Sequence, residues 1–135
     1  MTGSNRTDGV ALVKELARRF QAGDGQGAAQ LFHPDVRIEQ PASLPHGGWH
    51  HGLDGMQQMG ATFNRFWDRT IASPRIFGSD EGVAQLTTQT WTARATGRSA
   101  TIDVVELFAF ADERIAEIRV FQQDTHLLLS LLDQI

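Results

Sequence analysis

The sequence predicts one α+β domain, with helices gathered on one face of a strongly curved antiparallel sheet. In the first half of the chain, apolar residues recur at spacings of three and four, which is the helical period. The second half consists mainly of long strand-like runs separated by turn residues. No repeat or linker divides the 135 residues. We therefore expect residues 1–135 to form a single domain, with residues 1–6 as a flexible N-terminus.

Three helices are expected in the first half of the chain. Thr7 or Asp8 is a suitable N-cap for the first helix, and Gly23 is suited to its C-terminal end. The apolar positions of this helix are Val10, Val13, Leu16, Ala17 and Phe20. A short second helix is expected over residues 26–32, ended by the pair at residues 33–34, His-Pro. The third helix is predicted from a buried stripe formed by Met56, Met59, Phe63, Phe66 and Trp67.

The predicted strands begin with residues 36–40, where Val36, Ile38 and Gln40 share one face ahead of Pro41. Residues 41–52 are rich in Pro, Gly and His and are predicted to form a loop. Further strands are predicted over residues 71–77, 83–94, 101–110 and 115–122. The last residues are expected to form a short apolar helix or tail.

Composition excludes several functional classes. Because the chain has no cysteine, it contains no disulfide framework, thiolate metal site or cysteine nucleophile. Twelve Lys and Arg against sixteen Asp and Glu give a net charge of −4, and no stretch is densely basic, so no nucleic-acid partner is expected. No apolar run is long enough to span a membrane, and the polar first residues do not resemble a secretion signal. We therefore expect a cytoplasmic protein without a membrane partner.

A bent sheet over helices encloses an apolar cone with one open end, which is the usual shape of a small-ligand pocket. Glu106 is the first candidate for chemistry there. It shares a strand face with four bulky apolar residues, Ile102, Val104, Phe108 and Phe110. Burial among such residues disfavours the ionised form and is expected to raise the pKa of Glu106, as a general acid or a neutral donor to an oxyanion requires. In the alternative interpretation, this face points outward and Glu106 pairs with an Arg at a dimer contact.

Gln122 and Asp124 form a second candidate set. They share strand parity with Ile118 and Val120, and are expected to lie toward the mouth of the cone if that apolar pair points inward. Asp124 is then an acid/base candidate, but an Asp-Thr pair before an apolar run is equally an ordinary helix N-cap. Gln40 is placed at the inner end of the first strand, where an amide can orient a substrate but is a very poor proton acceptor.

The loop over residues 41–52 holds His46, Trp49, His50 and His51. Histidine titrates near neutral pH and can act as an acid, a base or a ligand. The glycines at positions 47 and 48 prevent the helical geometry in which paired histidines bind metal, so no metal site is expected. Exposed histidines are the default interpretation. His46 is the catalytic candidate among them, because its neighbours can hold it over the pocket rim.

Aromatic side chains are the candidates for substrate contact, although such stripes more often belong to the core. These candidates are Trp49, Phe63, Trp67 and Trp91. No serine lies in the G-x-S-x-G context of a hydrolase nucleophile. Neither a G-x-G-x-x-G nor a P-loop pattern is present, so nucleotide binding is not indicated.

A resemblance to the nuclear transport factor 2-like superfamily, in particular its ketosteroid isomerase-like and SnoaL-like polyketide cyclase branch, extends over nearly the whole chain. It is carried by three segments in order: FQAGDGQGAAQLFHPDVRIEQP, LPHGGWHHGLDGMQQM and TIDVVELFAFADERIAEIRVFQQDT. The resemblance implies a cystatin-like, cone-shaped barrel of strongly curved antiparallel or mixed sheet wrapped around three N-terminal helices. It also implies a homodimer with a hydrophobic cavity, and neither a metal nor an organic cofactor.

Ketosteroid isomerase chemistry transfers only in part. The proton-shuttling Asp of that family ends the first strand before a proline, where this chain has Gln40. Its oxyanion tyrosine falls at Leu16, and this chain contains no tyrosine at all. The second oxyanion donor of ketosteroid isomerases, a protonated Asp in the penultimate strand, corresponds to Glu106. SnoaL-like cyclases instead use an acid/base Asp near the end of the final strand, which Asp124 resembles. The Asp-Arg-Asp set of limonene epoxide hydrolase-like members is not matched, because Arg119 and Asp124 have opposite strand parity.

Two functional hypotheses follow. The first is a cofactor-independent enzyme of the isomerase, cyclase or dehydratase type, distinct from standard steroid isomerases. It would transfer protons on a small hydrophobic carbonyl compound, with Asp124 or His46 as base, Glu106 as neutral acid, and Gln40 and Gln122 as orienting groups. The second is a non-catalytic ligand-binding or dimeric interaction module of the same fold. A deep cavity with at least two converging ionisable groups favours the enzyme, whereas a cavity plugged by aromatic side chains favours the module.

Overall fold

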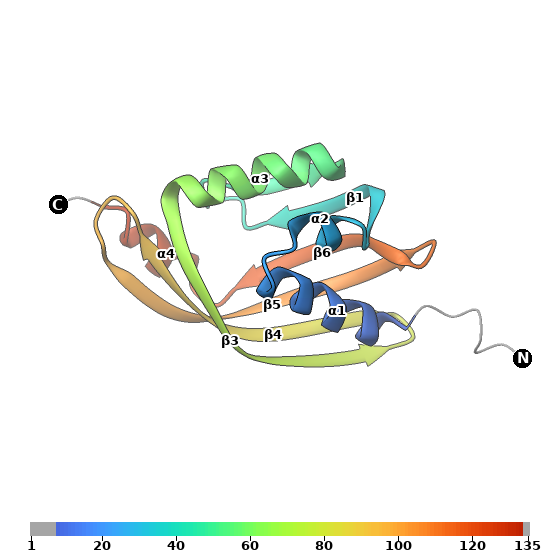
Figure 1. Cartoon of the computed structure of the whole chain (residues 1–135). Helices are drawn as coiled ribbons and strands as arrows, with labels where there is room; N and C mark the ends of the chain where they lie inside the picture. The colour runs from blue at the N-terminus through green and yellow to red at the C-terminus, as the bar shows by residue number, and fades with distance from the viewer. Residues whose placement is uncertain (1–7, 134–135) are drawn as a thin grey trace, which may run out of the picture.

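A curved sheet with helices on one face makes up residues 8–133, the part of the chain that the computed structural model describes (Figure 1). The expected flexible N-terminus, residues 1–6, lies outside the described residues. The helices are α1 (Gly9–Gln21), α2 (Gly25–Ala29), α3 (Gly52–Phe66) and α4 (Thr125–Ser130). The strands are β1 (Phe32–Gln40), β2 (Gly48–His51), β3 (Trp67–Ser79), β4 (Gly82–Ala93), β5 (Ser99–Ala111) and β6 (Arg114–Gln122).

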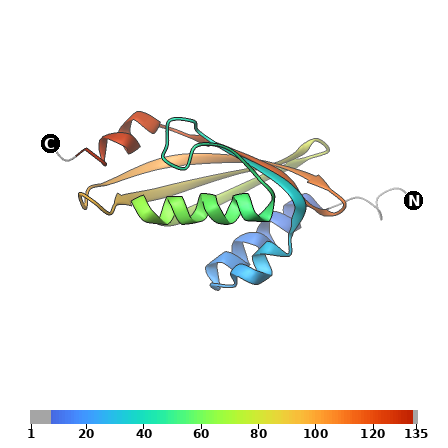
Figure 2. The same cartoon turned by 90° about the horizontal axis from the view of Figure 1, so that it is seen from above.

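The α+β fold class is confirmed, and the sheet is mixed. Its strand order is β2-β1-β6-β5-β4-β3, and neighbouring strands are antiparallel except for the parallel pair β1 and β6. Because β2 and β3 are the two edges, the sheet is a curved, open wall rather than a closed barrel. Helices α1, α2 and α3 lie on the same face of this wall, and α4 lies at one end of it (Figures 1 and 2).

Helix α1 begins and ends where the sequence predicts. The Asp8 carboxylate accepts a hydrogen bond from the Ala11 N–H at 3.0 Å, which caps the first turn. Val13 and Leu16 are the fully buried side chains of the helix. Gly23 follows the helix with a φ of 74°, a left-handed conformation that glycine adopts without steric cost.

The connection from α2 to β1 differs from the prediction. Helix α2 ends at Ala29, and β1 begins at Phe32, so the expected helix-ending proline lies inside the strand. Phe32 pairs with Ile115 of β6, and the register shifts before it resumes at Arg37. This irregularity accommodates Pro34, because proline has no N–H to donate to the sheet.

Residues 48–51, predicted as loop, form the short edge strand β2. The strand pairs antiparallel to β1, with Gln40 opposite Gly48 and Ile38 opposite His50. This hairpin turns residues 41–47 back over the inner face of the sheet. Leu44 and His46 are consequently buried, each less than 5% exposed.

Strand β3 begins earlier than predicted. Trp67, expected on the third helix, has extended backbone angles (φ −136°, ψ 148°) and is the first residue of the strand. Arg69 then lies directly opposite the buried Trp91 of β4. Opposed residues of an antiparallel pair share a face, so Arg69 lies on the inner face of the sheet. A register shift between Ala72 and Arg75 follows.

The core lies between the inner face of the sheet and the helices. Strand β4 alternates strictly between buried and half-buried residues, as expected for a sheet that is packed on one face. Trp67 and Trp91 are the largest fully buried side chains of the core, with ring centroids 5.2 Å apart.

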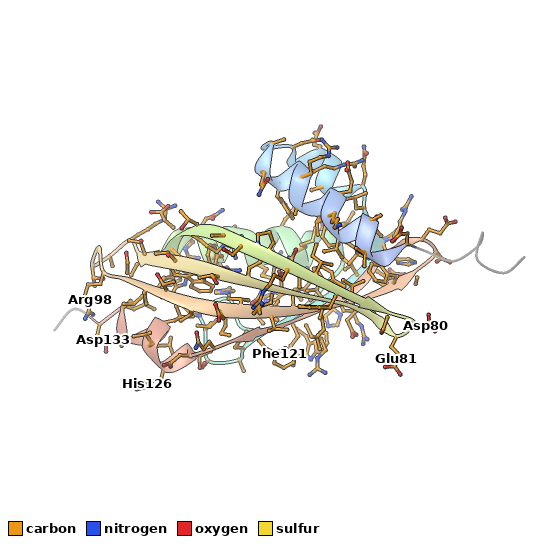
Figure 3. All side chains as sticks on the ribbon, turned by 90° about the horizontal axis from the view of Figure 1, so that it is seen from below. Asp80, Glu81, Arg98, Phe121, His126 and Asp133 are labelled. Carbon is orange, nitrogen blue, oxygen red and sulfur yellow. The ribbon has the colours of Figure 1, made fainter. Side chains whose placement is uncertain are left out.

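The C-terminal apolar segment forms α4 and packs on its own chain, with Leu128 and Leu131 buried. The turn between β4 and β5 holds this helix. The Thr96 hydroxyl donates a hydrogen bond to the Leu131 carbonyl, and Arg98 Nη2 donates one to the Ser130 carbonyl, both at 2.6 Å. Figure 3 shows Arg98 beside Asp133, the end of the described chain.

The outer face of the sheet carries some large apolar side chains. Leu107 and Phe121 are more than 40% exposed there, and Phe121 is labelled in Figure 3. The homodimer expected from the resemblance stays a prediction.

No helix within residues 8–133 combines the length and apolar character needed to cross a membrane.

Candidate functional site

A cavity of about 370 Å³ lies between α3, the end of α1 and the inner face of the sheet. Helix α3 contributes Met56, Met59 and Phe63 to its wall, and Phe20 of α1 stands at its side. Such a cavity is what the sequence predicts for a bent sheet over helices. Ionisable and amide side chains reach into it from the strands and from the turn over residues 41–47.

Glu106 faces this cavity from the middle of β5. Gln85 of β4 and Val120 of β6 flank it in register, on the same inner face. Gln85 Nε2 donates a hydrogen bond to Glu106 Oε1 at 3.1 Å. Burial raises the pKa of the Glu106 carboxyl, and this effect outweighs those of Gln85 and the Arg69 charge, which lower it. The inward orientation is confirmed, and the outward placement at a dimer contact is wrong.

Sequence reasoning missed Arg69. The third helix was predicted to run through Trp67, so the residues just after it were not predicted to be part of a strand. No inward or outward orientation was therefore assigned to them. In the structure, the Arg69 guanidinium carbon lies 4.6 Å from the Phe63 ring centroid, and burial lowers the pKa of Arg69. Its side chain lines the cavity although part of it is exposed. Two-residue alternation starting at Trp67 would have indicated the inward orientation.

His46 is buried, contrary to the default expectation of exposed loop histidines. Only 3% of its surface is exposed, and its ring packs edge-on against Phe63 with centroids 5.1 Å apart. Burial lowers the pKa of His46 to about 4, and the charges of Arg69 and His50 add to this effect. The imidazole is therefore neutral at pH 7. Its Nδ1 atom is buried and finds no hydrogen-bond partner within residues 8–133.

A buried polar row on β4 was also missed. Gln85, Thr87 and Gln89 all lie on the inner face and are at most 8% exposed. Trp91 Nε1 donates a hydrogen bond to Gln89 Oε1 at 2.8 Å, and Gln89 Nε2 donates one to Thr87 Oγ1 at 2.9 Å. The alternation across residues 83–93 could have revealed this row. Gln85, Thr87 and Gln89 have the same strand parity as Trp91, so they lie on the same face of the strand.

Gln40 and Gln122 both line the cavity, as predicted. The Gln40 amide nitrogen lies 3.6 Å from the Met59 sulfur, which is a weak acceptor. Gln122 Oε1 is buried without a hydrogen-bond partner among the described residues. The two amides therefore retain hydrogen-bonding capacity toward a molecule in the cavity.

Comparison with known proteins identifies the family. Residues 13–118 match the model of a family described as the SnoaL-like domain. The chain belongs to this family. A search of curated proteins returned no match.

Solved structures of SnoaL-like and nuclear transport factor 2-like proteins share the fold. One nuclear transport factor 2-like protein of unknown function, from Burkholderia pseudomallei, has a TM-score of 0.83 and 26% identity, covering 94% of this chain and 98% of that chain. A candidate SnoaL-like polyketide cyclase from Mesorhizobium loti has a TM-score of 0.63 and 21% identity, covering 82% and 96%. A candidate polyketide cyclase from Pseudomonas putida has a TM-score of 0.67 and 17% identity, covering 84% and 90%.

Asp124, the acid/base candidate by resemblance to SnoaL-like cyclases, lies outside the cavity. It is exposed and is the N-cap of α4, where its carboxylate accepts a hydrogen bond from the Leu127 N–H at 2.9 Å. The expected inward placement is wrong because β6 ends at Gln122 and the strand alternation does not continue to position 124. The helix-cap interpretation therefore describes this residue.

Asp124→Ala is expected to lower the free energy of unfolding by about 1 kcal/mol without changing the binding of a small molecule in the cavity, because only a helix cap is lost. Urea denaturation measures the first effect. Asp124→Ser is the matched control, since serine also caps helices and should retain most of the stability. A large loss of small-molecule binding in both variants would contradict the assignment of Asp124 as a helix cap alone.

Two of the aromatic candidates also lie outside the cavity of this SnoaL-like domain. Trp49 is 42% exposed, and the guanidinium of Arg37 stacks over its ring, with the guanidinium carbon 5.3 Å from the ring centroid. It is opposite Glu39 at the sheet edge, on the outer face. Trp67 is fully buried behind Trp91 and belongs to the core.

The structure thus brings six predicted residues to one cavity, namely Gln40, His46, Phe63, Trp91, Glu106 and Gln122. Trp91 stands edge-on to Phe63, with ring centroids 5.0 Å apart. Within residues 8–133, no three His, Asp or Glu side chains are grouped so as to hold a metal ion. The chemistry available to this cavity from the chain itself is hydrogen bonding and proton transfer.

Proposed function

We propose that this SnoaL-like domain is a small-molecule enzyme that transfers protons on a hydrophobic, carbonyl-bearing substrate. One observation carries the proposal: His46 and Glu106 line the same largely apolar cavity. Burial lowers the pKa of His46 and raises the pKa of Glu106. Both groups therefore favour their neutral forms, one as a proton acceptor and the other as a proton donor.

The proposed reaction begins with removal of a proton from the carbon next to the substrate carbonyl. His46 accepts that proton on a ring nitrogen, and the carbonyl oxygen gains negative charge as the enolate forms. The neutral Glu106 carboxyl donates a hydrogen bond to this oxygen, which stabilises the developing charge more strongly than water would. Where the substrate has a carbon–carbon double bond next to the deprotonated carbon, the enolate is a dienolate, and return of the proton from His46 to the far carbon of that double bond completes an isomerisation. Attack of the enolate carbon on a second carbonyl would instead close a ring.

The glutamines fix the substrate in this scheme. Gln89 is held by Trp91 and Thr87, so its amide is in a defined orientation. Gln40 and Gln122 offer further amide groups from the neighbouring strands β1 and β6. An amide is a very poor base, so these residues position the substrate while His46 and Glu106 move protons.

Deuterium exchange tests the proposal without knowledge of the natural substrate. The probe is 2-tetralone, a bicyclic ketone with acidic protons beside its carbonyl, in deuterated buffer followed by proton NMR. We expect the wild-type protein to accelerate the exchange above the rate measured with the double variant H46F/E106Q, which lacks both groups. Equal rates for the two proteins would contradict the proposed chemistry and leave the ligand-binding module as the better interpretation.

A further inference from the structure

A second cavity of about 500 Å³ adjoins the first on the side of α1. It lies between α1, the inner face of β4 and the edge strand β3. Four residues line both spaces: Phe20, Arg69, Gln89 and Glu106. Arg69 and Glu106 therefore stand where the two cavities meet. A ligand longer than either cavity would pass these two side chains.

The two cavities contain few ionisable groups. Among their lining residues, only His46, Arg69 and Glu106 can carry a charge. His46 is neutral at pH 7, since burial lowers its pKa to about 4. Burial also favours the neutral form of Glu106. Burial thus favours the neutral form of both His46 and Glu106 and leaves Arg69 as the cationic group of the joined space, in a chain whose net charge is −4.

Arg69 forms no ion pair with a carboxylate of the described residues, and its electrostatic interaction with Glu106 is the one that raises its pKa. Within residues 8–133, no carboxylate lies within 4.0 Å of the Arg69 guanidinium, whereas other arginines such as Arg37 and Arg119 are paired with glutamates on the outer face. Its guanidinium lies over the Phe63 ring, a contact that supplies no carboxylate oxygen to its N–H groups. A partly desolvated, unpaired cation costs stability. A bound anion would remove this cost.

We propose that the joined cavity binds an elongated, largely apolar organic acid, whose carboxylate or ionised enol is held by Arg69 at the junction. This inference names the substrate class of the proposed enzyme and rests on the proposed function only for the statement that the bound acid is a substrate. Arginine suits the task because its planar fork binds two oxygens of a carboxylate at once. The exposed part of Arg69 gives an anion access from solvent.

The remaining polar groups indicate hydroxyl substituents on the same ligand. Gln85 Oε1 and Gln122 Oε1 are buried acceptors without a partner among the described residues. A buried acceptor without a donor costs free energy, so hydroxyl groups at matching positions would strengthen binding. The aromatic and methionine side chains of α3 would contact the apolar body of the ligand.

Binding of an anion would also make His46 a stronger base. The charge of Arg69 is one of the causes that lower the pKa of His46. A negative charge placed on Arg69 offsets that effect, so the pKa of His46 should rise when an acid binds. The acid would thus activate the residue that removes its proton.

Calorimetric titration with 2-naphthoate and its neutral isostere 2-naphthamide tests the inference at pH 7. We expect wild-type protein to bind the carboxylate at least tenfold more tightly than the amide. Arg69→Gln should abolish this preference and Arg69→Lys should retain part of it. Arg65→Gln is the matched control, because Arg65 also lies over an aromatic ring, that of Phe66, but does not line either cavity. This control should bind as the wild type does.

Equal binding of the two probes by the wild type, or no binding of either, would overturn the inference. So would a carboxylate preference that survives Arg69→Gln. A strong rise in naphthoate affinity on Glu106→Gln would also overturn it, because Glu106 would then be ionised and already neutralising Arg69. A carboxylate preference that depends on Arg69, together with no exchange of 2-tetralone, would support the inference and reject the proposed function.

Discussion

Glu106→Gln is expected to slow the exchange of 2-tetralone by about 10²-fold, which is within the range attributed to a single acid or donor. The amide keeps the size of the side chain and can still donate a weak hydrogen bond. It cannot supply the stronger donor of a neutral carboxylic acid to the forming enolate. Proton NMR of the deuterated ketone measures the rate.

The same substitution should also change how stability depends on pH: the free energy of unfolding of Glu106→Gln, relative to that of wild type, should increase as the pH rises. Burial raises the pKa of Glu106 above its ordinary value of 4.5, so above about pH 4.5 the unfolded chain loses this proton while the folded chain keeps it. Wild-type stability from this residue is present below pH 4.5 and is lost as the pH rises toward the folded pKa. The glutamine variant has no such loss. Its free energy of unfolding relative to wild type should therefore increase from pH 4 to pH 7.

Glu113→Gln is the matched control for both measurements, because Glu113 is exposed in the turn between β5 and β6. It should leave the exchange rate at the wild-type value and should not reproduce the stability change expected of Glu106→Gln. A Glu106→Gln variant that exchanges 2-tetralone at the wild-type rate removes Glu106 from the mechanism. A stability difference that does not vary with pH means that Glu106 is ionised in the folded protein.

His46→Phe is expected to lower the exchange rate by about 10²-fold and to make the protein more resistant to acid. The pKa of His46 is about 4 in the folded protein, compared with an ordinary value of 6.5. Its contribution to stability is therefore full above pH 6.5 and is lost as the pH falls toward 4, by about 3 kcal/mol. Phenylalanine keeps the ring between Phe63 and Trp91 but cannot bind a proton.

Urea denaturation at pH 7.5 and pH 4 measures this difference. The control is His126→Gln, because His126 is exposed on α4 and labelled in Figure 3. The comparison uses the change between the two pH values, so a constant packing cost of the larger ring cancels. If wild type and His46→Phe lose the same stability between pH 7.5 and pH 4, His46 is not a neutral buried base.

Alternation along the strands was the most reliable guide to this site. It placed Glu106 and Gln122 in the cavity, because both lie in regular strands with well-defined apolar neighbours. The same rule failed for Asp124, which lies beyond the end of β6 and follows the geometry of a helix start. Sequence parity is informative only while the strand continues.

The remaining errors concern places where local patterns cannot show tertiary contacts. Trp67 fits a helical stripe, but its burial against Trp91 and pairing with Ala93 make it the start of β3. Because the strand was predicted to begin only at residue 71, the inward orientation of Arg69 was not recognised. The turn containing His46 has no periodicity, so only the fold of the hairpin could reveal that the side chain is buried.

The protonation state of Glu106 is the central claim and can be measured directly. Carbon-13 NMR of protein labelled at glutamate side-chain carboxyls follows each carboxyl through a pH titration, and the signal absent from Glu106→Gln identifies Glu106. We predict a signal that still has the chemical shift of a neutral carboxylic acid at pH 7. A signal that has the chemical shift of an ionised carboxylate at pH 7 would contradict the proposed chemistry.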